Sequence, residues 1–195
     1  AQTESVSLFW QCFYPTCLDL RSVALNSATD GWAVGQGGTM LRLQNGQWRP
    51  WPSLTSLDLY DVTLVTPNQG WAVGGTGERR IALYWDGVSW SHYPFSFINP
   101  NEFAHQNAPR AVAQLGGRAW TVGQRSQAWE LRRGEWYLLG RVGGQELDLT
   151  ALALVGPDAG WAVGGKKDGA SLASSAARLV GGQWNNFTMP GINGN

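Results

Sequence analysis

Gly31-Trp32-Ala33-Val34-Gly35 is the stretch of sequence that decides the fold, because it occurs four times along the chain. It recurs unchanged at residues 70–74 and 160–164, and residues 119–123 carry the variant Ala-Trp-Thr-Val-Gly. The tryptophans of successive copies are 39, 49 and 41 residues apart. A period of this length is typical of β-propeller blades and exceeds that of leucine-rich repeats. Four copies therefore predict four blades.

Each copy lies between other strand signals. An alternating apolar segment such as Val23-Ala24-Leu25 precedes it, and a third apolar run follows it. Every unit then has a turn that ends in tryptophan, at Asn45-Gly46-Gln47-Trp48, Asp86-Gly87-Val88-Ser89-Trp90, Arg133-Gly134-Glu135-Trp136 and Gly181-Gly182-Gln183-Trp184. Asn-Gly and Asp-Gly between apolar runs indicate hairpins, because glycine accepts the positive φ that these turns need. Each unit is therefore predicted to be a four-stranded antiparallel meander.

The predicted fold is an all-β propeller of four four-stranded blades in a single domain covering residues 1–195. We favour one four-bladed domain, since an open array would expose blade faces and strand edges. The alternative is that these blades are part of a larger propeller array. The predicted parts are an N-terminal strand at 6–20, blade 1 at 21–58, blade 2 at 59–94, an insertion at 91–109, blade 3 at 110–147 and blade 4 at 148–190.

Composition and charge narrow the classes of partner. The 14 basic and 14 acidic residues balance, so bulk electrostatics do not indicate a nucleic acid or an anionic lipid surface. No apolar run approaches the roughly 18 to 20 residues that a bilayer span needs, so no transmembrane segment is expected. The 26 glycines and 12 tryptophans are typical of a chain of short strands, many turns and large aromatic anchors.

Cys12 and Cys17 flank the turn-forming stretch Tyr14-Pro15-Thr16 and could close a small disulfide loop in an oxidising compartment. The alternative is a pair of free thiols. A zinc site is not expected, because it needs about four ligands and the two histidines lie far along the chain. We expect no metal and no cofactor, and we predict an extracytoplasmic location, that is periplasmic, secreted or at the cell surface.

The repeat resembles the glycine-tryptophan propellers of the photosystem II assembly and stability factor family, and more loosely the Asp-box repeats of bacterial sialidases. Gly-Trp-Ala-Val-Gly followed by a turn ending in tryptophan carries the resemblance along nearly the whole chain. It implies a module that holds a protein partner, such as a subunit of a membrane-associated or extracellular complex. The chain departs from the Asp-box pattern except near Asp86-Gly87-Val88-Ser89-Trp90. Members of the assembly-factor family typically close seven blades, whereas this chain supplies four.

The departures from the repeat predict where a partner binds. In a propeller, the loops between second and third strands and the links from a fourth strand to the next blade emerge on one face, and loops carry function on a rigid scaffold. The insertion at 91–109 is rich in aromatic residues, and the second-to-third-strand loops carry basic ones. The predicted partner-binding residues are Arg79, Arg80, His92, Tyr93, Phe95, Phe97, Phe103, His105, Arg125, Lys166 and Lys167.

The sequence is compatible with three functions, and a non-catalytic protein-binding or assembly module is favoured. The first alternative is a carbohydrate-binding, lectin-like propeller in which turn tryptophans stack on sugar rings, namely Trp48, Trp90, Trp136 and Trp184. A glycosidase is the weaker alternative, because no motif identifies three clustered arginines with a tyrosine nucleophile. A serine hydrolase would need a nucleophile elbow, which the sequence lacks. We therefore assign no catalytic residue.

Overall fold

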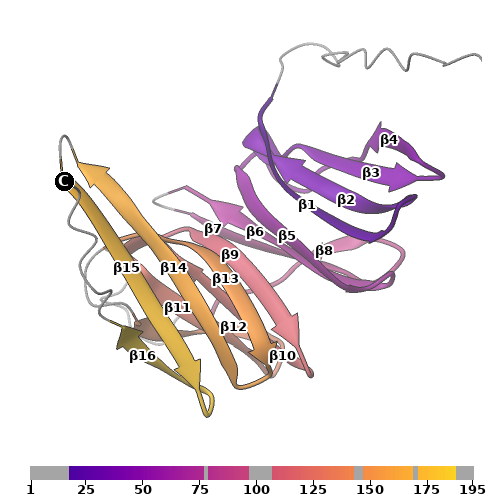
Figure 1. Cartoon of the computed structure of the whole chain (residues 1–195). Helices are drawn as coiled ribbons and strands as arrows, with labels where there is room; N and C mark the ends of the chain where they lie inside the picture. The colour runs from indigo at the N-terminus through magenta and orange to yellow at the C-terminus, as the bar shows by residue number, and fades with distance from the viewer. Residues whose placement is uncertain (1–17, 77–78, 97–106, 143–146, 169–170, 188–195) are drawn as a thin grey trace, which may run out of the picture.

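The computed structural model describes residues 18–76, 79–96, 107–142, 147–168 and 171–187. Within them the chain forms four antiparallel sheets, each made of four strands that follow one another in sequence (Figure 1). This arrangement confirms the prediction of an all-β protein with four four-stranded blades. Apart from its end, the strand predicted at 6–20 lies outside the described residues, as do Cys12 and Cys17.

The strands of each blade run outward from the first to the fourth. Blade 1 contains β1 (Leu20–Ser27), β2 (Asp30–Gly35), β3 (Met40–Gln44) and β4 (Gln47–Pro50). Blade 2 contains β5 (Leu59–Thr66), β6 (Gln69–Gly75), β7 (Arg80–Trp85) and β8 (Trp90–His92). Blade 3 contains β9 (Pro109–Leu115), β10 (Arg118–Gly123), β11 (Gln127–Arg132) and β12 (Glu135–Arg141). Blade 4 contains β13 (Leu149–Gly156), β14 (Ala159–Asp168), β15 (Ser171–Val180) and β16 (Gln183–Phe187).

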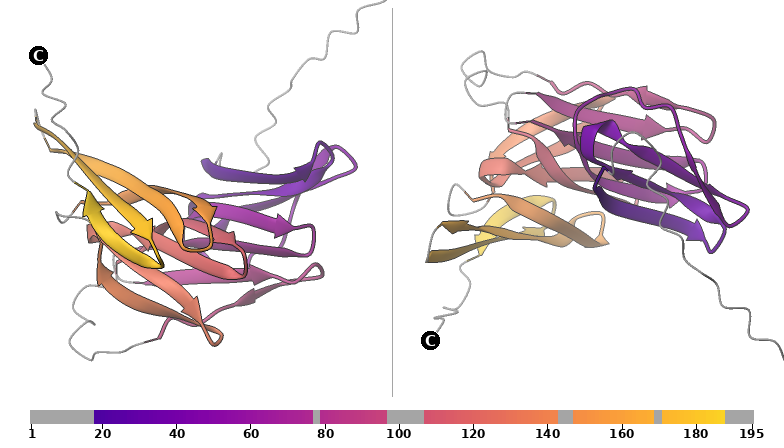
Figure 2. Two further views of the ribbon diagram at one scale, coloured as in Figure 1. Left: turned by 60° about the horizontal axis from the view of Figure 1, so that its bottom comes forward. Right: turned by 90° about the horizontal axis from the view of Figure 1, so that it is seen from above.

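The four first strands lie next to one another in chain order, with β1 packed on β5, β5 on β9, and β9 on β13. Figure 2 shows the blades fanning out from this row into an arc, with blade 1 in indigo at one end and blade 4 in orange and yellow at the other. Each of the three blade-to-blade interfaces has its own apolar cluster. No described segment forms a helix that is long and apolar enough to cross a membrane.

The second-strand tryptophans of blades 1, 2 and 3 each hold two blades together. Trp32, Trp71 and Trp120 are buried, and each lies edge-on to a tryptophan in the fourth strand of the next blade. The pairs are Trp32 with Trp90, Trp71 with Trp136 and Trp120 with Trp184, with ring centroids 5.1, 5.1 and 6.0 Å apart. One repeated side chain therefore builds all three interfaces.

The glycines of the repeat are required because neighbouring backbone atoms lie too close to leave room for a Cβ atom. A Cβ on Gly35 would lie 2.0 Å from the carbonyl oxygen of Asp19, so the last position of the motif tolerates only glycine. The leading glycine has a different cause. Gly31 follows a β-bulge in the pairing of β1 with β2, and a Cβ there would lie 2.6 Å from the carbonyl oxygen of Ala24. Blade 3 pairs Ala119 with Gln114 in regular register, which explains why this copy carries alanine instead.

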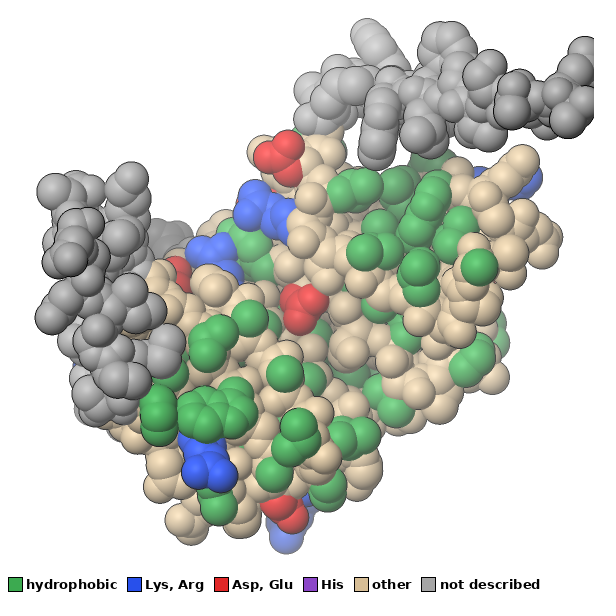
Figure 3. All heavy atoms as spheres, in the orientation of Figure 1, with side chains coloured by type: hydrophobic (Ala, Val, Ile, Leu, Met, Phe, Trp, Pro, Cys, Tyr) green, Lys and Arg blue, Asp and Glu red, His purple; other side chains and the backbone are tan. Residues whose placement is uncertain are grey.

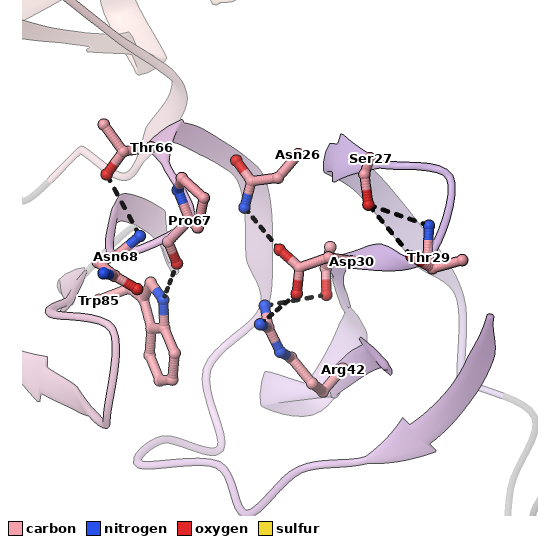
Figure 4. Close-up of polar contacts among 10 residues, drawn as sticks. Asn26, Ser27, Thr29, Asp30, Arg42, Thr66, Pro67, Asn68 and Trp85 are labelled. Carbon is pink, nitrogen blue, oxygen red and sulfur yellow. Dashed lines mark hydrogen bonds and ion pairs between the residues drawn. The ribbon is translucent and has the colours of Figure 1, made fainter. Parts of the chain in front are cut away.

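Tight hairpins join the first strand to the second and the third to the fourth in each blade, and their polar contacts are internal (Figure 4). Asn26 Nδ2 donates to Asp30 over 2.9 Å, and Asp30 also pairs with Arg42 of β3. In blade 2 the indole N–H of Trp85 donates to the carbonyl of Pro67 over 3.0 Å. Asn45 and Gly46 both have positive φ, as the predicted Asn-Gly hairpin requires. These turns are therefore fastened to the strands of their own blades.

Asp61 of β5 joins three blades. Its carboxylate accepts hydrogen bonds from Ser22 Oγ of β1 over 2.7 Å and from the backbone N–H of Val112 of β9 over 2.8 Å. It also accepts the N–H of Val62 over 2.9 Å. Burial among the first strands raises the pKa of Asp61 above its usual 3.8, although these hydrogen bonds act to lower it.

The tryptophan joints can be tested with two matched substitutions. We expect Trp71→Ala to lower the free energy of unfolding by about 3–5 kcal/mol, because it removes a buried ring shared by blades 2 and 3. Trp48→Ala, at an exposed ring of β4, should cost about 0.5 kcal/mol or less. Urea unfolding followed by circular dichroism measures both. Equal losses in the two variants would contradict the role assigned to the second-strand tryptophan.

Asp61 predicts a pH dependence of stability. Because its pKa is higher in the folded chain than in the unfolded chain, the folded state binds its proton more tightly. The wild-type free energy of unfolding should therefore fall relative to that of Asp61→Asn as pH rises from about 3.8 through the folded-state pKa. Urea midpoints of both proteins across the acidic range give this difference. A difference that is constant with pH would contradict the raised pKa.

Candidate functional site

Two kinds of connection meet on one face of the arc, which we call the linker face. They are the connections between second and third strands and the linkers from a fourth strand to the next blade. The backbone N–H of Gly37, in a connection of the first kind, donates to the carboxylate of Asp58, at the end of a linker, over 2.9 Å. Arg125 donates in the same way to Asp148 over 3.2 Å. The insertion predicted at 91–109 falls in a connection of the second kind, between β8 and β9.

A pocket of about 340 Å³ opens on the linker face beside blade 2. Its wall is built from the linker before β5, the start of β7 and the segment after β8. Leu57, Ile81, Ala82 and Pro94 contribute to the lining. Five residues predicted from the sequence complete it, namely Arg79, Arg80, His92, Tyr93 and Phe95. The fold thus brings two separate parts of the predicted site, the basic loop and the start of the aromatic insertion, into one pocket.

The start of the insertion is fixed by backbone pairing with blade 3. Ser96 donates its N–H to the carbonyl of Trp136 over 2.9 Å, and Trp136 donates to the carbonyl of Pro94 over 2.9 Å. Phe95 forms a parallel bridge to Trp136 at the outer edge of β12. Because this segment adds to the sheet of the next blade, the wall of the pocket is held by two blades.

The floor of the pocket is apolar and part of the interface between blades 2 and 3. Phe95 is buried in that cluster, and Tyr93 packs edge-on to Trp71 with ring centroids 4.9 Å apart. The guanidinium carbon of Arg80 lies 5.4 Å from the centre of the Phe95 ring, within the range of a cation–π contact. Tyr93 and Phe95, which were predicted to contact a partner, are therefore packing residues, and Phe95 also contacts Arg80.

The rim of the pocket is cationic. Arg79 and His92 are exposed, whereas Arg80 is half-buried. His92 Nε2 lies 3.2 Å from the carbonyl oxygen of Leu54, and since a carbonyl can only accept, Nε2 carries the hydrogen. No carboxylate is among the described residues that line the pocket. The exposed guanidinium of Arg79 can receive an anionic group, and the floor can receive an apolar one.

A second cationic cluster, which no sequence pattern predicted, lies at the starts of the first strands. The guanidinium carbons of Arg21 and Arg110 lie 4.7 and 3.8 Å from the centre of the Tyr60 ring, one from each neighbouring blade. Arg21 pairs with Asp58 over 2.9 Å, whereas the buried Nε of Arg110 has no hydrogen-bond partner. Only the alignment of β1, β5 and β9 brings these three residues together.

The other predicted partner-binding residues are not part of the pocket. Arg125 belongs to the 3₁₀ turn η3 (Gln124–Ser126) after β10, and is half-buried at the interface of blades 3 and 4. Lys166 and Lys167 lie on β14, and their side chains are outside what the structure describes. Phe97, Phe103 and His105 lie outside the described residues altogether.

The four turn tryptophans do not form a repeated sugar-stacking surface. Trp90 and Trp136 are buried at blade interfaces, so neither ring has a face open to a ligand. Trp184 is half-buried against Trp120, and only Trp48 is exposed. The prediction of one equivalent stacking ring per blade is wrong for Trp90 and Trp136, because the next blade's fourth strand supplies the partner for each second-strand tryptophan.

Asp86 carries the one turn that approaches the Asp-box pattern. Its Oδ1 accepts the backbone N–H groups of Val88 and Ser89, each over 2.8 Å. These hydrogen bonds lower the pKa of the Asp86 carboxyl group, led by the bond from Ser89. Asp86 therefore stabilises the hairpin between β7 and β8. Among the described residues, no group of three His, Cys, Asp or Glu side chains is placed to hold a metal ion.

Comparison with known proteins gives no match to a family model and none to a curated protein sequence. Solved structures do match. YCF48, in a structure described as bound to D1 peptide, superposes with a TM-score of 0.63 and 23% identity. That match covers 88% of this chain and 55% of the YCF48 chain.

Two further matches come from other sources. The β-propeller domain of Myceliophteria thermophila Cps50 (Swd1) gives a TM-score of 0.53 at 10% identity, covering 80% of this chain and 57% of that one. The computationally designed Ika4 protein gives a TM-score of 0.53 at 16% identity, covering 82% and 92%. The chain thus spans little more than half the length of the first two. At these identities the likeness establishes the fold, and the fold is that of a β-propeller.

Proposed function

We propose that this propeller is a non-catalytic binding module that holds a peptide segment of a protein partner on its linker face. The observation that carries the proposal is the pocket beside blade 2, with a cationic rim at Arg79 and Arg80, and His92 beside them, over an apolar floor. A peptide that offers a carboxylate next to an apolar or aromatic side chain fits both parts. Its carboxylate would receive charge-assisted hydrogen bonds, which are among the stronger polar contacts.

The size and rigidity of the pocket support a peptide rather than a large ligand. A volume of about 340 Å³ is at the low end of small-molecule pockets and suits one or two side chains. The floor is part of the packed interface between blades 2 and 3, so little order would be lost on binding. The second cationic cluster at Arg21 and Arg110 offers a further contact for an extended acidic segment on the same face.

The likeness to YCF48, whose structure is described as bound to D1 peptide, is consistent with an assembly role of this kind. The proposal includes a partner that belongs to a membrane-associated or extracellular complex. It also includes an extracytoplasmic location, which is supported by the spacing of Cys12 and Cys17 around a turn.

The binding proposal is tested with labelled short peptides that share an aromatic residue and differ only in charge. Fluorescence anisotropy should detect binding of the acidic peptide, with weaker binding of its amidated, uncharged form. Arg79→Glu should weaken binding of the acidic peptide by about tenfold or more, because it replaces an attractive charge by a repulsive one. The affinity should also fall as salt is added.

Arg49→Glu is the matched control, because Arg49 is an exposed arginine on β4 that does not line the pocket. It makes the same change in net charge and should leave the affinity within error. Equal losses in Arg49→Glu and Arg79→Glu would mean that only bulk charge matters. Equal binding of the acidic and neutral peptides would contradict a cationic site.

A loop variant separates this pocket from the rest of the insertion. Residues 97–106 are replaced by a short glycine-serine linker while Pro94–Ser96 are kept, because those three residues pair with β12. If the pocket holds the partner, this variant keeps most of its peptide affinity. On a glycan array, binding that survives both Arg79→Glu and the loop change would contradict the peptide proposal and favour the carbohydrate-binding alternative.

A further inference from the structure

Blade 1 exposes the apolar residues that its neighbours bury. Val23 of β1 is 58% exposed, whereas Val62, at the same position of blade 2, is 4% exposed. Leu20 is 50% exposed against 0% for Leu59, and Trp48 is 40% exposed against 5% for Trp90. In blade 2 these positions face the preceding blade. The outer face of blade 1, made of Leu20, Val23, Leu25 and Trp48, is therefore one half of a blade interface (Figure 3, where hydrophobic side chains gather over β1 and β2).

Blade 4 exposes the other half of such an interface. Trp161 of β14 is 37% exposed and Val163 is 40% exposed, whereas Trp32 and Val34 at the same positions of blade 1 are fully buried. Packing of Trp161 on Trp48 would close the ring within one chain or join two copies of the chain. A second feature of the joints decides against this pairing.

Equivalent residues precede each first strand. In every blade, the backbone carbonyl at this position accepts a hydrogen bond from the N–H of the residue after the last glycine of the second-strand motif. The four donors, in chain order, are Gln36, Gly75, Gln124 and Gly165. The accepting residues are Asp19, Asp58, Ala108 and Asp148. Three of them stand in the same tripeptide, Leu-Asp-Leu, at residues 18–20, 57–59 and 147–149.

The aspartates are paired with one type of turn in the preceding blade. Blade 1 joins its second and third strands by the 3₁₀ turn η1 (Gln36–Gly38), and Gly37 of that turn donates to Asp58. Blade 3 has the corresponding turn η3, and its Arg125 donates to Asp148. Blade 2 closes this connection differently, with Thr76 N–H donating to the carbonyl of Arg79, and Ala108 follows it. At the three joints, a carboxylate is present where a 3₁₀ turn precedes it and absent where none does.

Asp19 has the carboxylate without the turn. Its side chain is exposed and makes no hydrogen bond or ion pair within the described structure. Blade 4 cannot supply the missing donor in the way that blades 1 and 3 do. Its strands β14 and β15 continue as a regular ladder past this point, with Lys166 opposite Ala173 where the turn would stand. Asp19 therefore does not match blade 4, whether of the same chain or of a second copy.

We propose that the outer face of blade 1 is the seat of a further blade of the same glycine-tryptophan repeat, distinct from blade 4. Its second and third strands are joined by a 3₁₀ turn whose amide donates to Asp19, and its second-strand tryptophan packs on Trp48. The match to YCF48 covers 55% of that chain, so the solved propeller extends beyond the part that these four blades match. This surface is separate from the pocket proposed to bind a peptide.

The first test uses the chain of 195 residues as it stands. Hydroxyl-radical oxidation followed by mass spectrometry should modify Trp48 several-fold faster than Trp90, and sedimentation equilibrium should give a monomer. Asp148→Ala should lower the urea midpoint, because it removes an existing joint contact, whereas Asp19→Ala should leave it unchanged. A dimer or monomer in which Trp48 is as protected as Trp90 would overturn the proposal, since blade 4 would then occupy the seat.

The second test supplies a blade with the required turn. A copy of residues 107–146, which carries Trp120 and the turn η3, is inserted between residues 17 and 18, so that Leu18-Asp19-Leu20 takes the place of Leu147-Asp148-Leu149. Oxidation of Trp48, Val23 and Leu20 should fall several-fold, and the urea midpoint should rise. Asp19→Ala should now lower that midpoint about as much as Asp148→Ala does.

The matched control is the same insertion with the η3 turn of the copy replaced by the blade 2 connection, residues 75–80. It should protect Trp48 less, and in it Asp19→Ala should have no effect. Unchanged oxidation of Trp48 in the first insertion would overturn the proposal, provided that circular dichroism shows the added strands have folded. Equal behaviour of the two insertions would overturn the role of the turn.

Discussion

The packing of one tryptophan per blade against the fourth strand of the next blade is the interaction on which the rest of the structure depends. Trp32, Trp71 and Trp120 each cross an interface, so a blade completes its core only when its neighbour is in place. A single four-stranded sheet has little interior of its own, and stability must come from such nearest-neighbour contacts. The partial exposure of the Trp48 and Trp161 rings has the same origin, because each ring is at an end of the arc.

The candidate site is a consequence of these joints. The linker that carries Leu57 and the segment Pro94–Ser96 both pass from one blade to another, and the pocket lies between them. Its cationic side chains are held by contacts that also stabilise the fold, since Arg80 lies over Phe95 at the interface of blades 2 and 3. A partner would therefore meet a rigid surface, and changes to the aromatic floor would affect folding as well as binding.

Departures from the repeat have two different causes. Ala119 replaces the leading glycine in blade 3 because the strand pairing there has no bulge, so no close backbone approach has to be avoided. The loss of aspartate at Ala108 accompanies the loss of the 3₁₀ turn in blade 2, because no turn amide is left to be satisfied. Both departures preserve hydrogen bonding and packing, and neither marks a binding residue.

The sequence by itself determined the four blades, their antiparallel hairpins and the place of a tryptophan at the end of each turn. These features depend on the strand period, on glycine and on turn residues, which act over short distances. It also identified Arg79, Arg80 and His92 as residues of one surface, from the topology of propeller loops. Only the tertiary structure decided that Tyr93 and Phe95 are packing residues, that Trp90 and Trp136 are closed to ligands, and that Leu57 completes the pocket. Those outcomes depend on which blade lies beside which, and burial between two blades cannot be derived from the local pattern of either one.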